Sequence, residues 1–201
     1  MQLRAIVRVA ADHDVRVLFP MVATGEELAA ALEMLGAATG TGRRPPAGVM
    51  IEVPSAALLA RRLAPEVAFL SIGTNDLTQY VLAADRGNER VQAIADPLHP
   101  AVLRLVAETA ARIPAAAAAG IRAAVCGEVA GDPAATPLLL GLGVRELSMS
   151  APSIPAVKDA VRRTSLEDAT VLSARALDAP GAPEVRALLE PGSGHVGTLG
   201  T

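Results

Sequence analysis

Aromatic residues and cysteine are scarce in this chain of 201 residues. It contains no Trp, one Tyr, two Phe and one Cys, so its core must be built from aliphatic side chains. Stacking of nucleic-acid bases on aromatic rings is therefore not the expected mode of binding. The single cysteine, Cys126, cannot form a disulfide within the chain, and we expect a reducing, cytoplasmic environment.

Long runs of positive charge and long hydrophobic runs are also missing. Basic residues never extend beyond pairs such as Arg43-Arg44, and the formal net charge is −3, which argues against a nucleic-acid partner. No apolar run is long enough for a membrane span, and the first residues lack the apolar segment of a signal peptide. With 51% hydrophobic and 19% charged residues, the composition is typical of a globular protein. The charge distribution and the lack of long apolar runs argue against a nucleic-acid partner and a membrane partner.

Short apolar runs alternate with helical patterns along the chain. The runs predict five strands at residues 15–20, 48–53, 67–72, 121–126 and 144–150. Because these runs are nearly continuous and each precedes a helix, they indicate a parallel sheet covered on both faces. A doubly wound open sheet and a (β/α)₈ barrel both fit, and a full barrel usually needs about 250 residues. The pattern alone does not choose between them.

Caps and breakers predict where the helices lie. Thr24 and Glu27 form a capping box, Asp132 with Pro133 begins a later helix, and Ser165 with Asp168 caps the last one. Residues 85–100 form an irregular connection. After about residue 180 the pattern is lost, so we expect residues 165–201 to form a C-terminal helix and a flexible tail.

Polar side chains gather where the predicted strands end. Glu52 closes the second strand, Asn75 and Asp76 follow the third, and Cys126 closes the fourth. In both architectures ligands bind at this edge of the sheet. Glu52 and Asp76 suit Mg²⁺, which proteins hold with one or two carboxylates plus phosphate oxygens and water. An equally good interpretation is that Asp76 caps its helix and Glu52 pairs with an arginine.

Two further candidates depend on position alone. Arg86 lies in the turn at residues 85–88, where its guanidinium could bind phosphate or carboxylate, although a solvated arginine is the simpler interpretation. Cys126 ends an apolar strand, where a cysteine is usually a small buried hydrophobe. Its place at the ligand-binding edge keeps an acid–base role open.

Several common catalytic motifs are absent. No strand is followed by a P-loop, a G-x-G-x-x-G run or a G-x-S-x-G elbow. The three histidines, His13, His99 and His195, have no metal-ligand spacing. Nucleotide-binding, serine-hydrolase and zinc-site interpretations therefore have no support.

The residues after the third predicted strand carry a resemblance to a known family. Residues 71–80 read Ser-Ile-Gly-Thr-Asn-Asp-Leu-Thr-Gln-Tyr and lead to Asp-Arg-Gly-Asn at 85–88. This run resembles the signature of the phosphoenolpyruvate-utilising enzymes. Three other segments match the family in the same order: Gly-Val-Met-Ile-Glu-Val-Pro at 48–54, Cys-Gly-Glu at 126–128 followed by Gly-Asp at 131–132, and Ser-Met-Ser at 148–150. The resemblance covers about residues 3–172.

Within that family the chain is most similar to Enzyme I, the phosphoenolpyruvate-protein phosphotransferase of the bacterial sugar phosphotransferase system. The turn at 85–88 and the segment Ser-Met-Ser-Ala-Pro-Ser-Ile-Pro at 148–155 are of the Enzyme I kind. Pyruvate phosphate dikinase and phosphoenolpyruvate synthase share the Gly-Thr-Asn-Asp core but differ in these two places. A barrel of the dikinase or synthase kind remains the alternative.

The resemblance implies a fold and a set of roles. The fold is an α/β (β/α)₈ TIM barrel of the phosphoenolpyruvate/pyruvate type, of which about five C-terminal units are present, at residues 1–164. Glu52 and Asp76 would hold Mg²⁺, and Asn75, Asp76 and Arg86 would bind phosphoenolpyruvate. Cys126 would protonate the enolate carbon. The implied reaction transfers the phosphoryl group to an enzyme histidine and then to the carrier protein HPr, and it releases pyruvate for sugar transport.

The resemblance also implies parts that this chain does not match. Family members carry an N-terminal phosphohistidine domain, a helical HPr-docking domain and three earlier barrel strands, and they form homodimers. None of the three histidines here matches the phosphorylated one. We therefore expect the chain alone to bind phosphoenolpyruvate poorly and to transfer nothing. A non-catalytic module for phosphoenolpyruvate binding or dimerisation is the second alternative.

Overall fold

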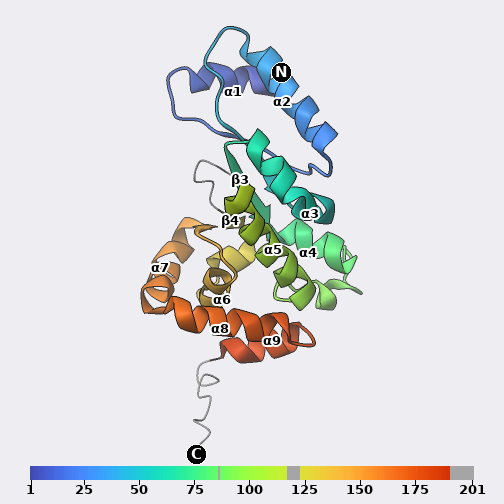
Figure 1. Ribbon diagram of the computed structural model, residues 1–201, viewed down its shortest axis with the longest axis vertical. Coiled ribbons are helices and arrows are strands. Elements are labelled where there is room, and N and C mark those ends of the chain that lie inside the picture. Colours follow the sequence, from blue (N-terminus) through green and yellow to red (C-terminus); the bar gives the residue numbers. More distant parts are fainter. Residues whose placement is uncertain (86, 117–122, 191–201) are drawn as a thin grey trace, which may run out of the picture.

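The five predicted strands form one parallel sheet in a computed structural model, which describes residues 1–85, 87–116 and 123–190 (Figure 1). The strands lie side by side in chain order. They are β1 (Val17–Phe19), β2 (Ala47–Ile51), β3 (Phe69–Gly73), β4 (Ala123–Cys126) and β5 (Glu146–Ser148). All four pairings are parallel, so every strand ends at the same edge of the sheet. The prediction of an α/β fold with five β/α units is confirmed.

Helices connect and follow the strands, as the parallel sheet requires. They are α1 (Gln2–Ala10), α2 (Gly25–Thr39), α3 (Pro54–Leu63), α4 (Thr74–Leu82), α5 (Pro100–Ala116), α6 (Thr136–Gly141), α7 (Ile154–Arg163), α8 (Leu166–Leu177) and α9 (Ala182–Leu189), with short 3-10 turns η1 (Ala64–Glu66), η2 (Gln92–Ile94), η3 (Glu128–Gly131) and η4 (Ala151–Ser153). In the described part of the chain, no helix combines the length and the apolar character that crossing a membrane requires.

Helix starts follow from local chemistry. Thr24 accepts a hydrogen bond from the Glu27 N–H at 3.2 Å, and the Glu27 carboxylate accepts one from the Thr24 N–H at 3.2 Å. This is the predicted capping box, and it begins α2. Ser165 accepts from the Asp168 N–H at 3.4 Å and begins α8, also as predicted. Pro54 occupies the first turn of α3, where its missing N–H costs nothing.

Two predictions about helices were wrong. The helix expected at Asp132 begins only at Thr136, because the Asp132 carboxylate accepts from the Ala134 N–H at 2.8 Å and closes a local turn instead. The chain also does not lose its structure after residue 180, because residues 182–189 form α9. Val185 of that helix is fully buried, which explains why a short helix is stable there.

The core is aliphatic, as the composition predicted. The fully buried large side chains are Leu28, Leu35, Ile51, Leu63, Leu70, Ile72, Leu77, Leu98, Leu103, Leu138 and Leu139. Ala176 of α8 and Val185 of α9 belong to the same buried cluster as the strands. The boundary drawn at residue 164 stays a prediction, and the tail at 191–201 lies outside the described residues.

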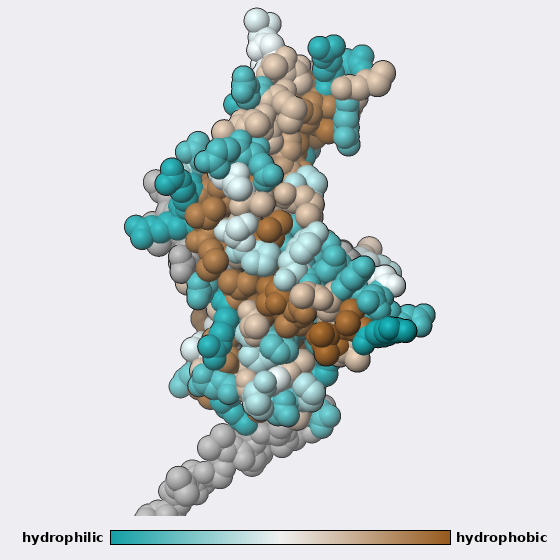
Figure 2. Space-filling model, turned by 90° about the vertical axis from the view of Figure 1, so that its right-hand side faces the viewer, coloured by the Kyte–Doolittle hydropathy of each residue, from teal (hydrophilic) through white to brown (hydrophobic). Residues whose placement is uncertain are grey.

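The molecule is elongated. Helices α1 and α2 lie at one end, and α8 and α9 lie at the other (Figure 1). Figure 2 shows the α1–α2 end as a narrow lobe, set off from the main body by a hollowed waist.

Candidate functional site

The predicted site residues follow the C-terminal ends of three adjacent strands. Gly73 of β3 pairs with Cys126 of β4, and Ile51 of β2 pairs with Ile72 of β3. This register aligns the strand ends. Glu52, Asn75 with Asp76, and Cys126 consequently emerge from neighbouring positions at one edge of the sheet.

The Glu52 carboxylate is almost completely buried, with 3% of the residue exposed. Its Oε1 accepts a hydrogen bond from the Met21 N–H at 2.7 Å. Its Oε2 lies against Gly73, where a Cβ atom would approach it to 3.0 Å. Because burying a carboxylate is costly unless polar partners or a cation compensate, this placement marks Glu52 as a functional candidate.

Met21 holds that carboxylate from a strained backbone position. It follows β1 with a φ of 56°, in the left-handed region that residues other than glycine seldom adopt. The turn is fixed from its other side by Ser55, whose hydroxyl donates to the Ala23 carbonyl at 2.8 Å. Strain of this kind is typical of sites where function requires a fixed geometry. No sequence motif pointed to Met21 as a site residue.

The start of α4 and the turn after β4 are tied together. The Thr74 hydroxyl donates to the Cys126 carbonyl at 2.9 Å, and the Asn75 Oδ1 accepts from the Glu128 N–H at 3.4 Å. Gly127 lies between these contacts with a φ of 112°. A Cβ atom at this position would meet the Thr74 Oγ1 at 2.3 Å, so only glycine fits. Thr74 was not among the predicted site residues, although the Gly-Thr-Asn-Asp run contains it.

Cys126 and Asn75 line the same open cleft, which has a volume of about 570 Å³. The Cys126 thiol is partly exposed and donates to the Ile72 carbonyl at 3.5 Å. The remaining wall of the cleft comes from the turn after β4 and from the segment after β5, namely Gly127, Glu128, Gly131, Asp132, Ser148, Met149, Ser150 and Ser153. Cys126 thus lines a cleft with several polar residues that is large enough for a small anionic substrate.

The structure does not bring every predicted residue into this cleft. Glu52 and Asp76 do not line it, although both have polar partners of their own. Arg86 lies outside the described residues. Among the residues that the structure describes, no three His, Cys, Asp or Glu side chains come together as a ready-made metal cluster.

The donor set nevertheless fits one kind of cation. Mg²⁺ needs only one or two carboxylates when substrate phosphate and water supply the other ligands. The buried Glu52 Oε2 against Gly73, and Asp76 in the first turn of the next helix, are donors of the required type. A site of this kind would be completed by its substrate and would not form a cluster of three protein ligands.

Comparison with known proteins decides the family. Residues 1–166 match the family model described as "PEP-utilising enzyme, PEP-binding domain". The chain belongs to this family. The resemblance drawn from the Gly-Thr-Asn-Asp run and its companion motifs is thereby confirmed.

Individual relatives carry more specific names than the family model. This chain is 47% identical over 197 residues to the phosphoenolpyruvate-protein phosphotransferase of Haemophilus influenzae and 46% identical over 198 residues to that of Haloferax volcanii. Both alignments cover 94% of this chain. It is 47% identical to a multiphosphoryl transfer protein of Rhodobacter capsulatus. The chain spans only about a third of the length of the two phosphotransferases, at 34%, and 22% of the third protein.

A solved structure supports the architecture. A citrate lyase from Burkholderia xenovorans superposes with a TM-score of 0.59 over 92% of this chain and 65% of that one, at 20% sequence identity. Together with the family match, the five parallel strands in sequential order are part of a TIM barrel of the phosphoenolpyruvate/pyruvate type. The sheet is open at β1 and at β5 in the part of the barrel described here.

Proposed function

We propose that this chain forms the phosphoenolpyruvate site of a phosphoenolpyruvate-protein phosphotransferase. The reaction is Mg²⁺-dependent transfer of the phosphoryl group from phosphoenolpyruvate to a histidine of the enzyme and then to HPr, with release of pyruvate. The observation that carries the proposal is the cleft shared by Asn75 and the Cys126 thiol, in a chain 47% identical to an enzyme of that name.

Substrate binding falls to residues at the strand ends. Asn75 presents its side chain to the cleft, and Arg86 would bind the phosphate as a charge-assisted donor. Glu52 and Asp76 would hold Mg²⁺, which when bound neutralises phosphate oxygens as the phosphoryl group leaves. The buried Glu52 is fixed for this task by the Met21 N–H. Phosphoryl transfer depends mostly on such positioning and charge stabilisation.

Cys126 would act as the acid. When the bond between phosphorus and the bridging oxygen breaks, the phosphoryl group passes to the histidine nitrogen and leaves the enolate of pyruvate. The Cys126 thiol gives its proton to the enolate carbon and becomes a thiolate, so pyruvate is the product. A thiol suits this role because it carries a transferable proton and cysteine is among the side chains that act in general acid–base catalysis.

The acceptor histidine does not come from the described part of this chain. His99 is engaged in local structure, because its Nδ1 accepts from the Ala101 N–H at 3.2 Å. His13 is exposed beyond the end of α1, away from the cleft lining. His195 lies outside the described residues. We place the acceptor histidine and the HPr-docking surface in the two thirds of the relatives that this chain does not span, and we expect the complete enzyme to be a homodimer.

Calorimetric titration of phosphoenolpyruvate, with and without Mg²⁺, tests the site. The wild-type chain should bind weakly, because the part of the relatives that it does not span would supply further contacts, and it should bind only with Mg²⁺, because the cation joins the substrate phosphate to Glu52 and Asp76. Glu52→Gln should abolish the Mg²⁺ dependence, whereas Glu33→Gln, a control on the surface of α2, should change nothing. Binding that is indifferent to Mg²⁺ and to Glu52 would contradict the metal assignment. Phosphoryl transfer to HPr by this chain alone would overturn the placement of the acceptor histidine.

A non-catalytic binding module is the second candidate, and the open edges at β1 and β5 favour it. The two candidates separate when Cys126→Ser is introduced into the complete phosphotransferase. The acid role requires pyruvate formation to fall by at least about a hundredfold while phosphoenolpyruvate affinity stays the same. An unchanged rate would favour binding without catalysis at Cys126.

A further inference from the structure

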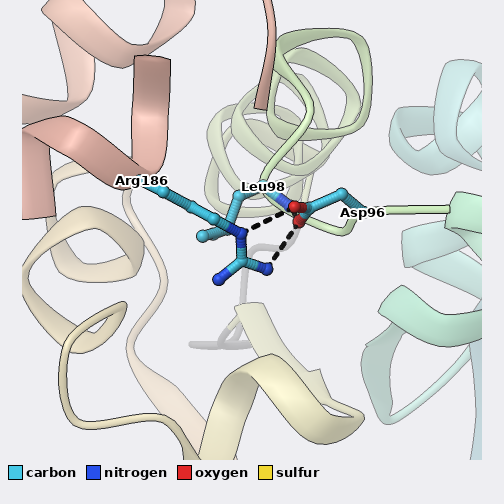
Figure 3. Close-up of polar contacts among 3 residues, drawn as sticks. All are labelled: Asp96, Leu98 and Arg186. Atoms are coloured by element: carbon cyan, nitrogen blue, oxygen red, sulfur yellow. Dashed lines mark hydrogen bonds and ion pairs between the residues drawn. The ribbon is translucent and has the colours of Figure 1, made fainter. Parts of the chain in front are cut away.

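Helix α9 lies beyond the matched family domain, yet it reaches back to the ligand-binding end of the sheet. Arg186 of α9 makes a two-pronged contact with Asp96, which precedes α5 (Figure 3). The Arg186 Nε donates to Oδ2 at 2.7 Å and the Nη2 donates to Oδ1 at 3.0 Å. Asp96 Oδ1 also accepts from the Leu98 N–H at 2.9 Å, which orients the carboxylate. We call this pair of residues the Asp96–Arg186 clasp.

The clasp has the geometry of a strong ion pair. Most surface pairs contribute little, but bidentate arginine–carboxylate pairs with a shielded partner are the exception. The Asp96 side chain is only 18% exposed, although that of Arg186 is 55% exposed. The hydrogen bond that Arg186 donates to Asp96 raises the pKa of Arg186 above its ordinary value; burial opposes this, and the charges of Asp96 and Asp132 add to it. Arg186 lines one cavity with both Asp96 and Asp132, which belong to two different segments.

One of those segments is a wall of the substrate cleft. Glu128 and Asp132, at the two ends of η3, line the cleft that contains Asn75 and Cys126. The same two residues line a second cavity, of about 420 Å³, together with Asp96 and Arg186. The η3 turn is thus a partition with the substrate cleft on one side and the clasp on the other.

The partition is coupled to the site by hydrogen bonds. The Glu128 N–H donates to Asn75 Oδ1, the Ala130 N–H to the Gly127 carbonyl at 3.2 Å, and the Asp132 N–H to the Val129 carbonyl at 3.3 Å. A shift of η3 would therefore move the Asn75 amide and the turn beside Cys126. The clasp also anchors the chain between η2 and α5, the second wall of the cavity behind η3.

We propose that Arg186 is a positioning residue for the phosphoenolpyruvate site, acting through Asp96 and the η3 partition from outside the family domain. The effect on phosphoenolpyruvate binding rests on the proposed function, whereas the coupling between the clasp and η3 does not. The proposal assigns a role in substrate binding to a helix that contributes no residue to the lining of the cleft. Because the contact joins residues 90 positions apart, it is made only in the folded chain.

The test combines two readouts on the whole 201-residue chain. The first is hydrogen exchange of the amides at residues 128, 130 and 132, measured without ligand. The second is the dissociation constant of phosphoenolpyruvate with Mg²⁺. The variants are Arg186→Gln, Arg186→Lys and Asp96→Asn, which keeps the acceptor for Leu98. Arg163→Gln is the control, because it breaks another exposed ion pair, Arg163 with Asp159 in α7, away from the cleft.

We expect faster exchange at those three amides and about fivefold weaker binding for Arg186→Gln and Asp96→Asn, a loss of the size that a bidentate pair supplies. Arg186→Lys should give intermediate values in both readouts. Combining Arg186→Gln with Asp96→Asn should weaken binding no more than either single substitution, because both remove the same ion pair. Arg163→Gln should change neither exchange nor binding.

Unchanged exchange in Arg186→Gln would overturn the clasp itself, whether or not phosphoenolpyruvate binds. Faster exchange with an unchanged dissociation constant would reduce the clasp to a structural contact and overturn its positioning role. Absence of phosphoenolpyruvate binding by the folded wild type would instead count against the proposed function, while the exchange data still decide the clasp.

Discussion

The two hydrophobic clusters of this molecule differ sharply in size. The main cluster lies around β2, β3 and β4 and includes Leu70, Ile72 and Val125, all with 0% exposure. The α1–α2 cluster has three buried members, Val17, Leu35 and Ala47, covered by partly buried side chains of α1 and α2. Because stability grows with the apolar area that a region removes from water, we infer that the α1–α2 end is the weaker part.

The difference matters because the site draws on both regions. Gly73, Cys126 and the η3 partition are attached to the main cluster, since Val129 and Ala130 are buried in it. Met21, which fixes the Glu52 carboxylate, lies between β1, whose Val17 belongs to the α1–α2 cluster, and Val22, which belongs to the main cluster. We therefore infer that local opening of the weaker end loosens the Met21 turn on Glu52 before it disturbs Cys126.

The largest effect should come from the main cluster. Leu70→Ala removes a fully buried side chain in β3, the central strand of the sheet, where the backbone is held by pairing with β2 and β4 and cannot move in to close the cavity. We expect a loss of about 4 kcal/mol in the free energy of unfolding. Urea denaturation followed by circular dichroism measures it, and a loss under about 1 kcal/mol would mean that the main cluster does not dominate stability.

Leu35→Ala tests the weaker end. Leu35 is also fully buried, but α1 and α2 can relax around the cavity, so we expect a smaller loss of about 2 kcal/mol. The sharper signature is local. Amides of α1 and α2 should exchange much faster, whereas the exchange rates of β3 and β4 should rise only as far as the loss in the free energy of global unfolding requires. Equal acceleration throughout the sheet would show that the two clusters unfold as one unit.

Gly127→Ala tests the junction between the main cluster and the site. The new Cβ would collide with the Thr74 Oγ1, and the φ of 112° is unfavourable for alanine. We expect a cost of about 2 kcal/mol and loss of phosphoenolpyruvate binding in calorimetry. Gly25→Ala is the matched control, because a Cβ there meets nothing within 4 Å. Retained affinity in Gly127→Ala would show that the tie between Thr74 and Cys126 is dispensable.

The smallest effect should be at Glu26, in the first turn of α2. Hydrogen bonds from its own backbone and from Thr24 lower the pKa of Glu26 below 4.5. A lowered folded-state pKa stabilises the protein above the unfolded value and loses that contribution as pH falls through the folded value. Because the side chain is fully exposed, Glu26→Gln should lower the melting temperature only slightly at pH 7. The difference should vanish well below pH 4.5, and a difference that grows on acidification would contradict this sign.

Much of the fold was predictable because the signals are local. Alternating apolar runs located all five strands, and the Thr24–Glu27 and Ser165–Asp168 pairs located two helix starts that the hydrogen bonds confirm. The two wrong helix predictions came from local patterns that are compatible with more than one structure. Asp132 closes a turn where a helix start was expected, and α9 is a short helix that only burial of Val185 stabilises.

The candidate site was predictable to the level of strand ends and no further. Parallel strands place Glu52, Asn75, Asp76 and Cys126 at one edge, and the structure confirms that Asn75 and Cys126 share a cleft. The contacts that fix the site carry no sequence signature of their own. The Met21 N–H on Glu52 and the Glu128 N–H on Asn75 join residues 31 and 53 positions apart.

The sequence by itself determined the parallel α/β class, the aliphatic core and the family, because periodicity, caps and motifs are written in neighbouring residues. Only the tertiary structure decided that Glu52 is buried against Gly73, that Met21 adopts a left-handed backbone, and that Arg186 reaches Asp96. These features depend on strand register and helix packing, where many weak contacts distant in sequence must be satisfied together.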